Sequence, residues 1–329
     1  MRVLNADEVW NGLPMNRAIP AMEEAFSAFS SGRSECPPRT RIKVPGEETD
    51  YLFMPASYLS GTGSPVVMKM IGINSENYAR GIPTVNASLL LSDGATGETL
   101  ALLEGGSLTA IRTGAASGLA TRLLSRPESS VLALFGAGNQ ARTQALAVCS
   151  VRPIREVRVY SPNREHVTQF IKECRGKSPL PERTIPAESP GDALSGADIV
   201  CTATTSGTPV FSDRDLEEGA HINAVGAYLP DTAEIPPKTV GRARIYVDSR
   251  AAAFSEAGDL ILPLREGIIR EAHVLGELGE LILGTIPGRE RPEEVTLFKS
   301  VGIAVQDAAA AWECYRNAVR LGIGTDIEW

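Results

Sequence analysis

The sequence predicts an α/β protein whose larger part is a doubly wound parallel sheet, and three observations support this. The chain has 329 residues, more than one hydrophobic core usually organises, so two domains are expected. From residue 131 onward, apolar strand-like runs alternate with helix-like stretches, which is typical of a parallel sheet covered by helices on both faces. The first of these runs passes directly into a glycine-rich turn that opens a helix, as in many such sheets.

The first part of the chain predicts a helix followed by a different kind of sheet. Residues 15–31 place Ile19, Met22, Phe26 and Phe29 at intervals of three and four, which indicates an amphipathic helix. From residue 50 to 104 the pattern changes to short apolar runs separated by turn residues. Such spacing favours an antiparallel or mixed sheet.

A helix rich in small residues is expected next, over 107–125, with Ser107 as its N-cap. The junction after it, SRPESS at 125–130, combines proline with several serines, so we place a domain boundary there.

The strands expected beyond this boundary are apolar and short. They are VLALF (131–135), EVRVYS (156–161), ADIVCTAT (197–204), HINAVGA (221–227) and ARIYVDS (243–249). A last helix, over 302–321, has no domain of its own and is expected to pack on the first domain.

Composition excludes several classes of protein. The formal net charge of −8 argues against a nucleic-acid partner, because a nucleic-acid groove needs clustered cations. The five cysteines are scattered and never form a C-x-x-C pair, and the three histidines are dispersed, so neither disulfides nor a metal site is expected. The N-terminus is charged and no long apolar run follows. We therefore expect a soluble cytoplasmic protein that does not enter a membrane.

The turn at residues 136–141 is a G-x-G-x-x-A fingerprint between a predicted strand and a predicted helix. Gly136 permits the tight turn, Gly138 lets the backbone approach a pyrophosphate, and Ala141 keeps the helix close to the strand. This context favours a dinucleotide cofactor over a merely structural turn.

The residues after the second strand of this unit discriminate between nicotinamide cofactors. An acidic residue there accepts ribose hydroxyls, whereas cations and hydroxyls receive a 2′-phosphate. The chain offers Ser161, Asn163 and Arg164, which favours NADP(H). Glu165 lies nearby, so NAD(H) remains possible.

Over nearly its whole length the chain resembles the ornithine cyclodeaminase/μ-crystallin family. The matching segments are PPRT (37–40), MPA (54–56), MKM (68–70), GIPTVNA (81–87), IRTGAASGLA (111–120), GAGNQA (136–141), GAHINAVGA (219–227), EAGDL (256–260) and FKSVGIAVQD (298–307). The resemblance implies a homodimer with a smaller α+β substrate-binding and dimerisation domain, formed by residues 1–125 and 305–329. A Rossmann domain, residues 126–304, is inserted between those two parts.

The resemblance also implies that a cationic cluster binds the substrate carboxylate, at Arg39, Lys69 and Arg112. Lys69 interrupts an apolar strand, where an unpaired buried ammonium costs several kcal/mol, so a buried Lys69 needs an anionic partner. An outward-facing Lys69 is the alternative, and Arg112 and Arg39 have ordinary surface and loop interpretations.

Further positions are carried over from the same segments. Met54 and Val301 are expected beside the substrate, with a plain core role as the alternative. The expected cofactor contacts are Thr84, Arg112, Gly136, Gly138, Asn139, Gln140, Ala141, Ser161, Asn163, Arg164, Thr202, Val225, Gly226, Lys299 and Ser300.

One departure from the family pattern bears on the reaction. Cyclodeaminases carry a proton-handling Asp after the AVG segment, and Tyr228 occupies that position here. The resemblance therefore implies hydride transfer between NAD(P)H and the α-carbon of a small α-imino or α-amino acid. Examples are reduction of pyrroline- or piperideine-2-carboxylate, or dehydrogenation of an alanine-like acid, with Lys69, Arg112 and Tyr228 as catalytic residues. A Tyr228 that only packs, a cyclodeaminase-type lyase, an opine-type dehydrogenase and a non-catalytic NADP-binding regulator remain alternatives.

Overall fold

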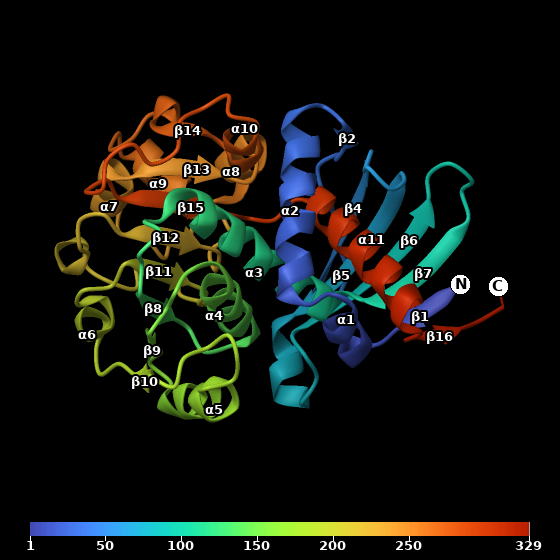
Figure 1. The fold of residues 1–329 in the computed structure, drawn as a ribbon, viewed down its shortest axis with the longest axis horizontal. Helices are drawn as coiled ribbons and strands as arrows, with labels where there is room; N and C mark the ends of the chain where they lie inside the picture. Colours follow the sequence, from blue (N-terminus) through green and yellow to red (C-terminus); the bar gives the residue numbers. More distant parts are fainter. Residues whose placement is uncertain (329) are drawn as a thin grey trace. The chain divides into compact units, whose positions relative to one another are not determined.

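A computed structural model describes residues 1–328 and confirms the α/β class, with two compact units (Figure 1). Unit 1 comprises Met1–Arg112 and the chain from Ile303 onward, and unit 2 comprises Thr113–Gly302. Among the described residues, no helix is both long and apolar enough to cross a bilayer.

Unit 1 contains the mainly antiparallel sheet that the short apolar runs predict. Its strand order is β16-β1-β7-β6-β5-β4-β2, with β3 also paired to β4. The bounds are β1 Arg2–Leu4, β2 Ser34–Glu35, β3 Thr40–Lys43, β4 Thr49–Tyr58, β5 Pro65–Asn74, β6 Val85–Asp93, β7 Thr99–Glu104 and β16 Thr325–Asp326. A short 3-10 helix, η1 (Ser75–Arg80), joins β5 to β6.

Helices cover one face of this sheet. Figure 1 shows α2 (Met15–Ser30) and α11 (Ala304–Leu321) side by side on it, and α11 contacts α2, β4 and β5. Helix α1 (Ala6–Gly12) contacts α11 as well. Because side chains alternate along a strand, Val67, Lys69 and Ile71 of β5 face the covered side, whereas Met68 and Met70 are exposed.

Unit 2 is a parallel sheet of order β10-β9-β8-β11-β12-β15-β13-β14. Its strands are β8 Val131–Phe135, β9 Glu156–Tyr160, β10 Thr184–Pro186, β11 Ile199–Thr202, β12 His221–Ala224, β13 Arg244–Val247, β14 Val274–Glu277 and β15 Thr296–Lys299. Leu132 and Leu134 of β8 belong to one buried cluster, and Ala133 and Phe135 to another. The sheet is therefore covered on both faces, as a doubly wound fold requires.

The connecting helices of unit 2 are mostly short. They are α4 Asn139–Val151, α5 Arg164–Cys174, α6 Pro190–Leu194, α7 Pro237–Arg242, α8 Arg250–Glu256, α9 Gly258–Arg265 and α10 Leu278–Ile282, with 3-10 turns η2 Asp213–Asp215 and η3 Glu271–His273.

Helix α3 (Gly105–Leu124) starts earlier than expected. The predicted Ser107 cap is wrong: the Glu104 carboxylate accepts hydrogen bonds from the Gly106 and Ser107 amides, at 2.6 and 2.8 Å. The division between the units falls inside this helix, between Arg112 and Thr113, rather than at 125/126. The reason is close packing of its second half on α4, where a Cβ added at Gly114 would lie 2.5 Å from the Thr143 carbonyl oxygen.

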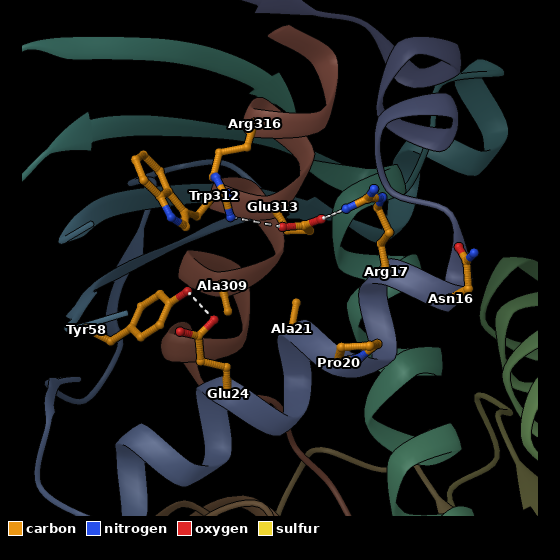
Figure 2. A pocket seen from close by; sticks show the side chains of 10 residues that line it. All are labelled: Asn16, Arg17, Pro20, Ala21, Glu24, Tyr58, Ala309, Trp312, Glu313 and Arg316. Atoms are coloured by element: carbon orange, nitrogen blue, oxygen red, sulfur yellow. Dashed lines mark hydrogen bonds and ion pairs between the residues drawn. The ribbon is translucent and has the colours of Figure 1, made fainter. Parts of the chain in front are cut away.

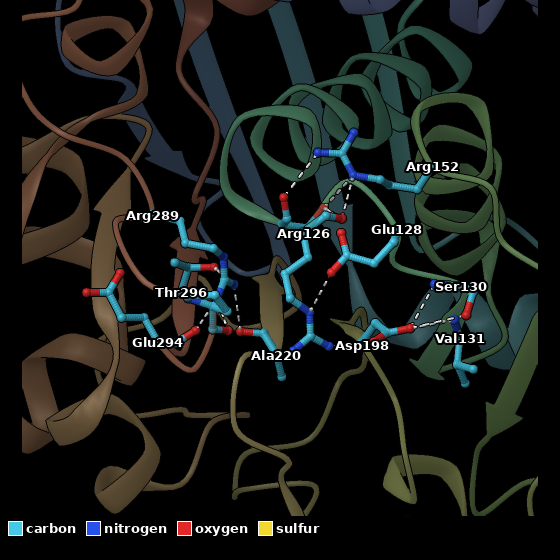
Figure 3. A network of polar contacts seen from close by, with 12 residues as sticks. Arg126, Glu128, Ser130, Val131, Arg152, Asp198, Ala220, Arg289, Glu294 and Thr296 are labelled. Atoms are coloured by element: carbon cyan, nitrogen blue, oxygen red, sulfur yellow. Dashed lines mark hydrogen bonds and ion pairs between the residues drawn. The ribbon is translucent and has the colours of Figure 1, made fainter.

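The amino edge of the parallel sheet is closed by a polar network (Figure 3). Asp198 accepts hydrogen bonds from the Ser130 and Val131 amides and pairs with Arg126 at 2.6 Å. Arg289 donates to the Leu124 carbonyl at 2.7 Å. These contacts hold the strand starts together, while ligands of open parallel sheets bind beyond the carboxyl ends.

Candidate active site

A buried ion-pair cluster lies on the covered face of the sheet in unit 1. The Lys69 Nζ donates to Asp307 Oδ2 at 2.5 Å, and the Arg112 Nε donates to Asp307 Oδ1 at 3.1 Å. The side chains of Lys69 and Asp307 are fully buried, and that of Arg112 is nearly so. Lys69 therefore has the anionic partner that its burial requires. The outward-facing interpretation of Lys69 is wrong.

The electrostatics of this cluster are dominated by burial. Burial lowers the pKa of Lys69, the Asp307 carboxylate raises it, and the positive charges of Arg112 and Arg39 lower it, so that the pKa is about 8. Half-buried Arg39 is thus close enough to act on Lys69. Lys69 and Arg112 share the single carboxylate of Asp307, so this cluster has excess positive charge and suits an anionic ligand.

Met54 and Thr84 occupy different environments in unit 1. Met54 pairs directly with Lys69 in the β4–β5 register and is buried on the same face. It therefore lies beside the cluster, and its expected contact with the substrate stays a prediction. Thr84 is exposed just before β6, and its carbonyl accepts a hydrogen bond from the Asn74 amide at 3.0 Å.

In unit 2 the glycine-rich turn has the geometry of a dinucleotide site. Gly136 has φ +104°, and an added Cβ would lie 2.4 Å from the Ala203 carbonyl oxygen. Gly138 precedes α4, and no described atom lies within 4 Å of the Cβ position. Ala141 is fully buried against the sheet. The open space at Gly138 and the helix start beyond it fit a pyrophosphate.

The next two residues of the turn carry polar side chains. Asn139 accepts a hydrogen bond from Arg142 at 3.0 Å. Gln140 has a buried Oε1 without a hydrogen-bond partner among residues 1–328. An orphaned acceptor beside the turn fits a site completed by a ligand.

The residues after β9 are already engaged in part. Asn163 caps α5 by accepting from the Glu165 and His166 amides. Arg164 donates to the Ala187 carbonyl at 2.8 Å and pairs with Glu188 at 3.0 Å. Ser161 is half-buried directly after the strand.

The carboxyl edge of the sheet brings together the remaining predicted cofactor residues of unit 2. Thr202 Oγ1 donates to Glu234 at 3.0 Å, and the Gly226 amide donates to the same carboxylate at 2.7 Å. Val225 follows β12, and its amide donates to the Thr202 carbonyl at 3.0 Å.

Polar groups at the end of β15 and just beyond it have protein partners. Lys299 is fully buried and pairs with Asp259 at 2.8 Å. The Ser300 hydroxyl and the Val301 amide both donate to Asp248, at 2.8 and 2.9 Å.

Four buried carboxylates that organise these groups were not predicted from the sequence. They are Asp248, Glu234, Asp259 and Asp307. Asp259 and Asp307 do lie in the EAGDL and FKSVGIAVQD segments, and an acidic residue inside an otherwise apolar segment was the available signal.

Tyr228 lies in the loop after β12 and is 44% exposed. The structure thus gives it no buried packing role.

A separate pocket of about 380 Å³ lies between α2 and α11 (Figure 2). The two arginines that line it both pair with Glu313, Arg17 at 2.7 Å and Arg316 at 3.6 Å. No predicted site residue lines this pocket.

Comparisons with known proteins agree on one family. The sequence pattern of the ornithine cyclodeaminase/mu-crystallin family matches residues 1–321. A Delta(1)-pyrroline-2-carboxylate reductase of Bacillus cereus is 40% identical, covering 100% of both chains. The structure of the Thermococcus litoralis Delta(1)-pyrroline-2-carboxylate reductase with NADH and L-proline has TM-score 0.93 and 38% identity, covering 99% of this chain and 100% of that one. An archaeal alanine dehydrogenase dimer with bound NAD has TM-score 0.91 and 32% identity, covering 100% and 99%.

Proposed function

Because the chain belongs to the ornithine cyclodeaminase/mu-crystallin family, we propose that it reduces a small cyclic α-imino acid of the pyrroline-2-carboxylate type. It is an oxidoreductase that uses a nicotinamide cofactor. The observation that carries the choice of substrate class is the buried cluster of Lys69 and Arg112 on Asp307. Such a cluster suits a compact carboxylate, and the apolar Met54 beside it suits a small ring.

The reaction needs a site for the substrate carboxylate and a site for the cofactor, which would supply a hydride when bound. Lys69 and Arg112 in unit 1 bind the substrate carboxylate and orient the adjacent α-carbon. In unit 2, the turn at Gly136 and Gly138 would hold the pyrophosphate.

This reaction requires little proton transfer by the protein. A protonated imine is already electrophilic, so addition of hydride to its α-carbon gives the neutral amine directly. Tyr228, being exposed, is available to donate a hydrogen bond to the substrate. We propose this lesser role for it. We also expect ornithine cyclisation to be slow, because Tyr228 occupies the position where cyclodeaminases carry a proton-handling Asp.

We further propose that NADP(H) is the preferred cofactor. No carboxylate occurs among residues 161–164 after β9. The Arg164–Glu188 pair is exposed, with 48% and 80% of the two side chains accessible. Exposed ion pairs are weak, so Arg164 can exchange Glu188 for a 2′-phosphate.

We also propose that a second copy of the chain covers the open face of the unit 1 sheet, giving a homodimer. This face carries exposed apolar side chains on neighbouring strands. They are Val66, Met68 and Met70 of β5 and Leu90 of β6, which pairs directly with Met68. A contiguous apolar patch of this kind marks an interaction surface. The archaeal alanine dehydrogenase was solved as a dimer, which supports a second copy as the occupant.

We also propose a cytoplasmic location. The scattered cysteines and the absence of a long apolar run in the sequence support this proposal.

A substrate screen tests the proposed reaction. Purified protein is mixed with NADPH or NADH and with pyrroline-2-carboxylate, piperideine-2-carboxylate, or pyruvate with ammonia, and oxidation is followed at 340 nm. We expect fast oxidation with a cyclic imine. Faster turnover with pyruvate and ammonia would make the chain an alanine dehydrogenase, and brisk conversion of ornithine to proline would contradict the proposal.

A further inference from the structure

We propose that Glu234 is a positioning residue that fixes the nicotinamide end of the cofactor site; this inference rests on the proposed function. Glu234 is fully buried in unit 2, between the segments that follow β11 and β12. In an open parallel sheet these segments border the ligand.

The Glu234 carboxylate accepts hydrogen bonds from both strand-end segments. Oε1 accepts from the Thr204 amide and the Thr204 hydroxyl, each at 2.7 Å. Oε2 accepts from the Thr202 hydroxyl at 3.0 Å and from the amides of Gly226 and Ala227 at 2.7 and 3.2 Å. One side chain thus ties the end of β11 to the end of β12.

These contacts require a carboxylate rather than any buried polar group. All five partners donate, and a carboxylate can accept at both oxygens. The amide of a glutamine would direct its own N–H groups at backbone N–H groups. Burial raises the pKa of Glu234, and the nearby Lys299 charge opposes that rise.

A second buried carboxylate holds Glu234 itself in place. Asp259 Oδ1 accepts from the amides of Glu234 and Ile235, at 2.7 and 2.9 Å. Its other oxygen pairs with Lys299, which donates to the Ala227 carbonyl at 2.5 Å. The backbone of residues 226–227 is therefore fixed at its amides by Glu234 and at a carbonyl by Lys299.

Backbone packing around this segment leaves no room for adjustment. A Cβ added at Gly226 would lie 2.4 Å from the Thr204 carbonyl oxygen and 2.5 Å from Glu234 Oε1. The Gly136 turn approaches the same stretch, because its added Cβ would lie 2.4 Å from the Ala203 carbonyl oxygen. Displacing residues 203–204 or 226–227 therefore changes the cofactor site on the far side of the pyrophosphate turn.

The test compares the intact dinucleotide with a fragment that lacks the nicotinamide. Dissociation constants are measured by calorimetry for the preferred reduced nucleotide and for ADP-ribose or its 2′-phosphate. Glu234→Gln is expected to weaken the dinucleotide about tenfold and the fragment less than twofold, because charge-assisted hydrogen bonds are lost only at the nicotinamide end. Thr204→Val removes one of the five donors. It is expected to raise the dissociation constant of the dinucleotide by about two- to threefold.

A matched control is provided by Glu294→Gln. Glu294 is also buried and accepts from two backbone amides, those of Glu290 and Arg291, but it lies at the amino edge (Figure 3). The Glu294→Gln variant should have a lower melting temperature, but the ratio of the dissociation constants of dinucleotide and fragment should not change.

Each outcome has a distinct meaning. Suppose that the wild type binds both ligands, but that neither Glu234→Gln nor Thr204→Val changes the ratio of the dissociation constants of dinucleotide and fragment. The inference on Glu234 is then overturned and the proposed function stands. If the wild type binds neither ligand, the proposed function fails and the inference with it. Should Glu234→Gln not fold, Thr204→Val decides alone.

Discussion

The ammonium group of Lys69 is fully buried, and two opposing effects set its pKa. Removal from water and the neighbouring arginines favour its neutral form, and Asp307 favours its charged form. The result is a lysine whose pKa is about 8 rather than the ordinary 10.5. Its affinity for a carboxylate therefore depends on pH in an accessible range.

The pH dependence of substrate affinity follows from this shift. Lys69 is protonated below pH 8 and loses its charge as the pH rises through about 8, so KM for the imine should rise there. Asp307→Asn removes the charge that raises this pKa, so the rise should move to lower pH. Measuring KM from pH 6 to 10 checks both, with the dissociation constant of the nucleotide as control. A KM that is flat across the range would exclude Lys69 as a carboxylate ligand.

The proposed preference for NADP(H) rests on a single residue, Arg164. Arg164→Ala should narrow a preference for NADPH over NADH by about tenfold, because one charge-assisted contact to the 2′-phosphate is lost. Arg175→Ala, at an exposed arginine after the same helix, serves as the control. Fluorescence titration with both nucleotides measures the preference, and tighter binding of NADH by the wild type would overturn the NADP(H) proposal.

At the scale of elements, strong periodicity was enough to predict several segments. Helix α2 and strands β4 to β7 lie where the patterns indicate. Strands β10 and β14 have three and four residues, too few for a period to show. Asp307 could not be paired with Lys69 from the sequence, because 238 residues separate them and only the return of α11 to unit 1 brings them together. The glycine-rich turn was predictable because its strand, turn and helix are contiguous.

The close packing of α3 on α4 predicts a large effect for a small change. Gly114→Ala should lower the free energy of unfolding by about 1–3 kcal/mol, because the new Cβ meets the backbone of Thr143. The control is Gly191→Ala in α6, where the nearest atom to the added Cβ is 3.7 Å away. Urea unfolding measures both variants. Equal stability of the two would show that the helices separate easily.

At the scale of the molecule, one face of the unit 1 sheet is covered by its own helices and the other exposes Met68 and Met70, each 41% accessible. The wild type should therefore have about twice the monomer mass of 35.0 kDa in light scattering. The double variant Met68→Glu, Met70→Glu should dissociate, since it places charges in an apolar interface. Leu283→Glu, at an exposed apolar residue of unit 2, should not. A monomeric wild type at micromolar concentration would contradict the dimer.

In the whole protein, the proposed reaction depends on Lys69 binding the substrate carboxylate, and the kinetics of Lys69→Met test this most directly. A charge-assisted hydrogen bond in a dry site contributes about 1.5–3 kcal/mol, so kcat/KM for pyrroline-2-carboxylate should fall about ten- to a hundredfold. The nucleotide dissociation constant should change less than twofold. Lys43→Met, at an exposed lysine of β3 in the same sheet, should behave as wild type. Full reductase activity in Lys69→Met would contradict the mechanism proposed here.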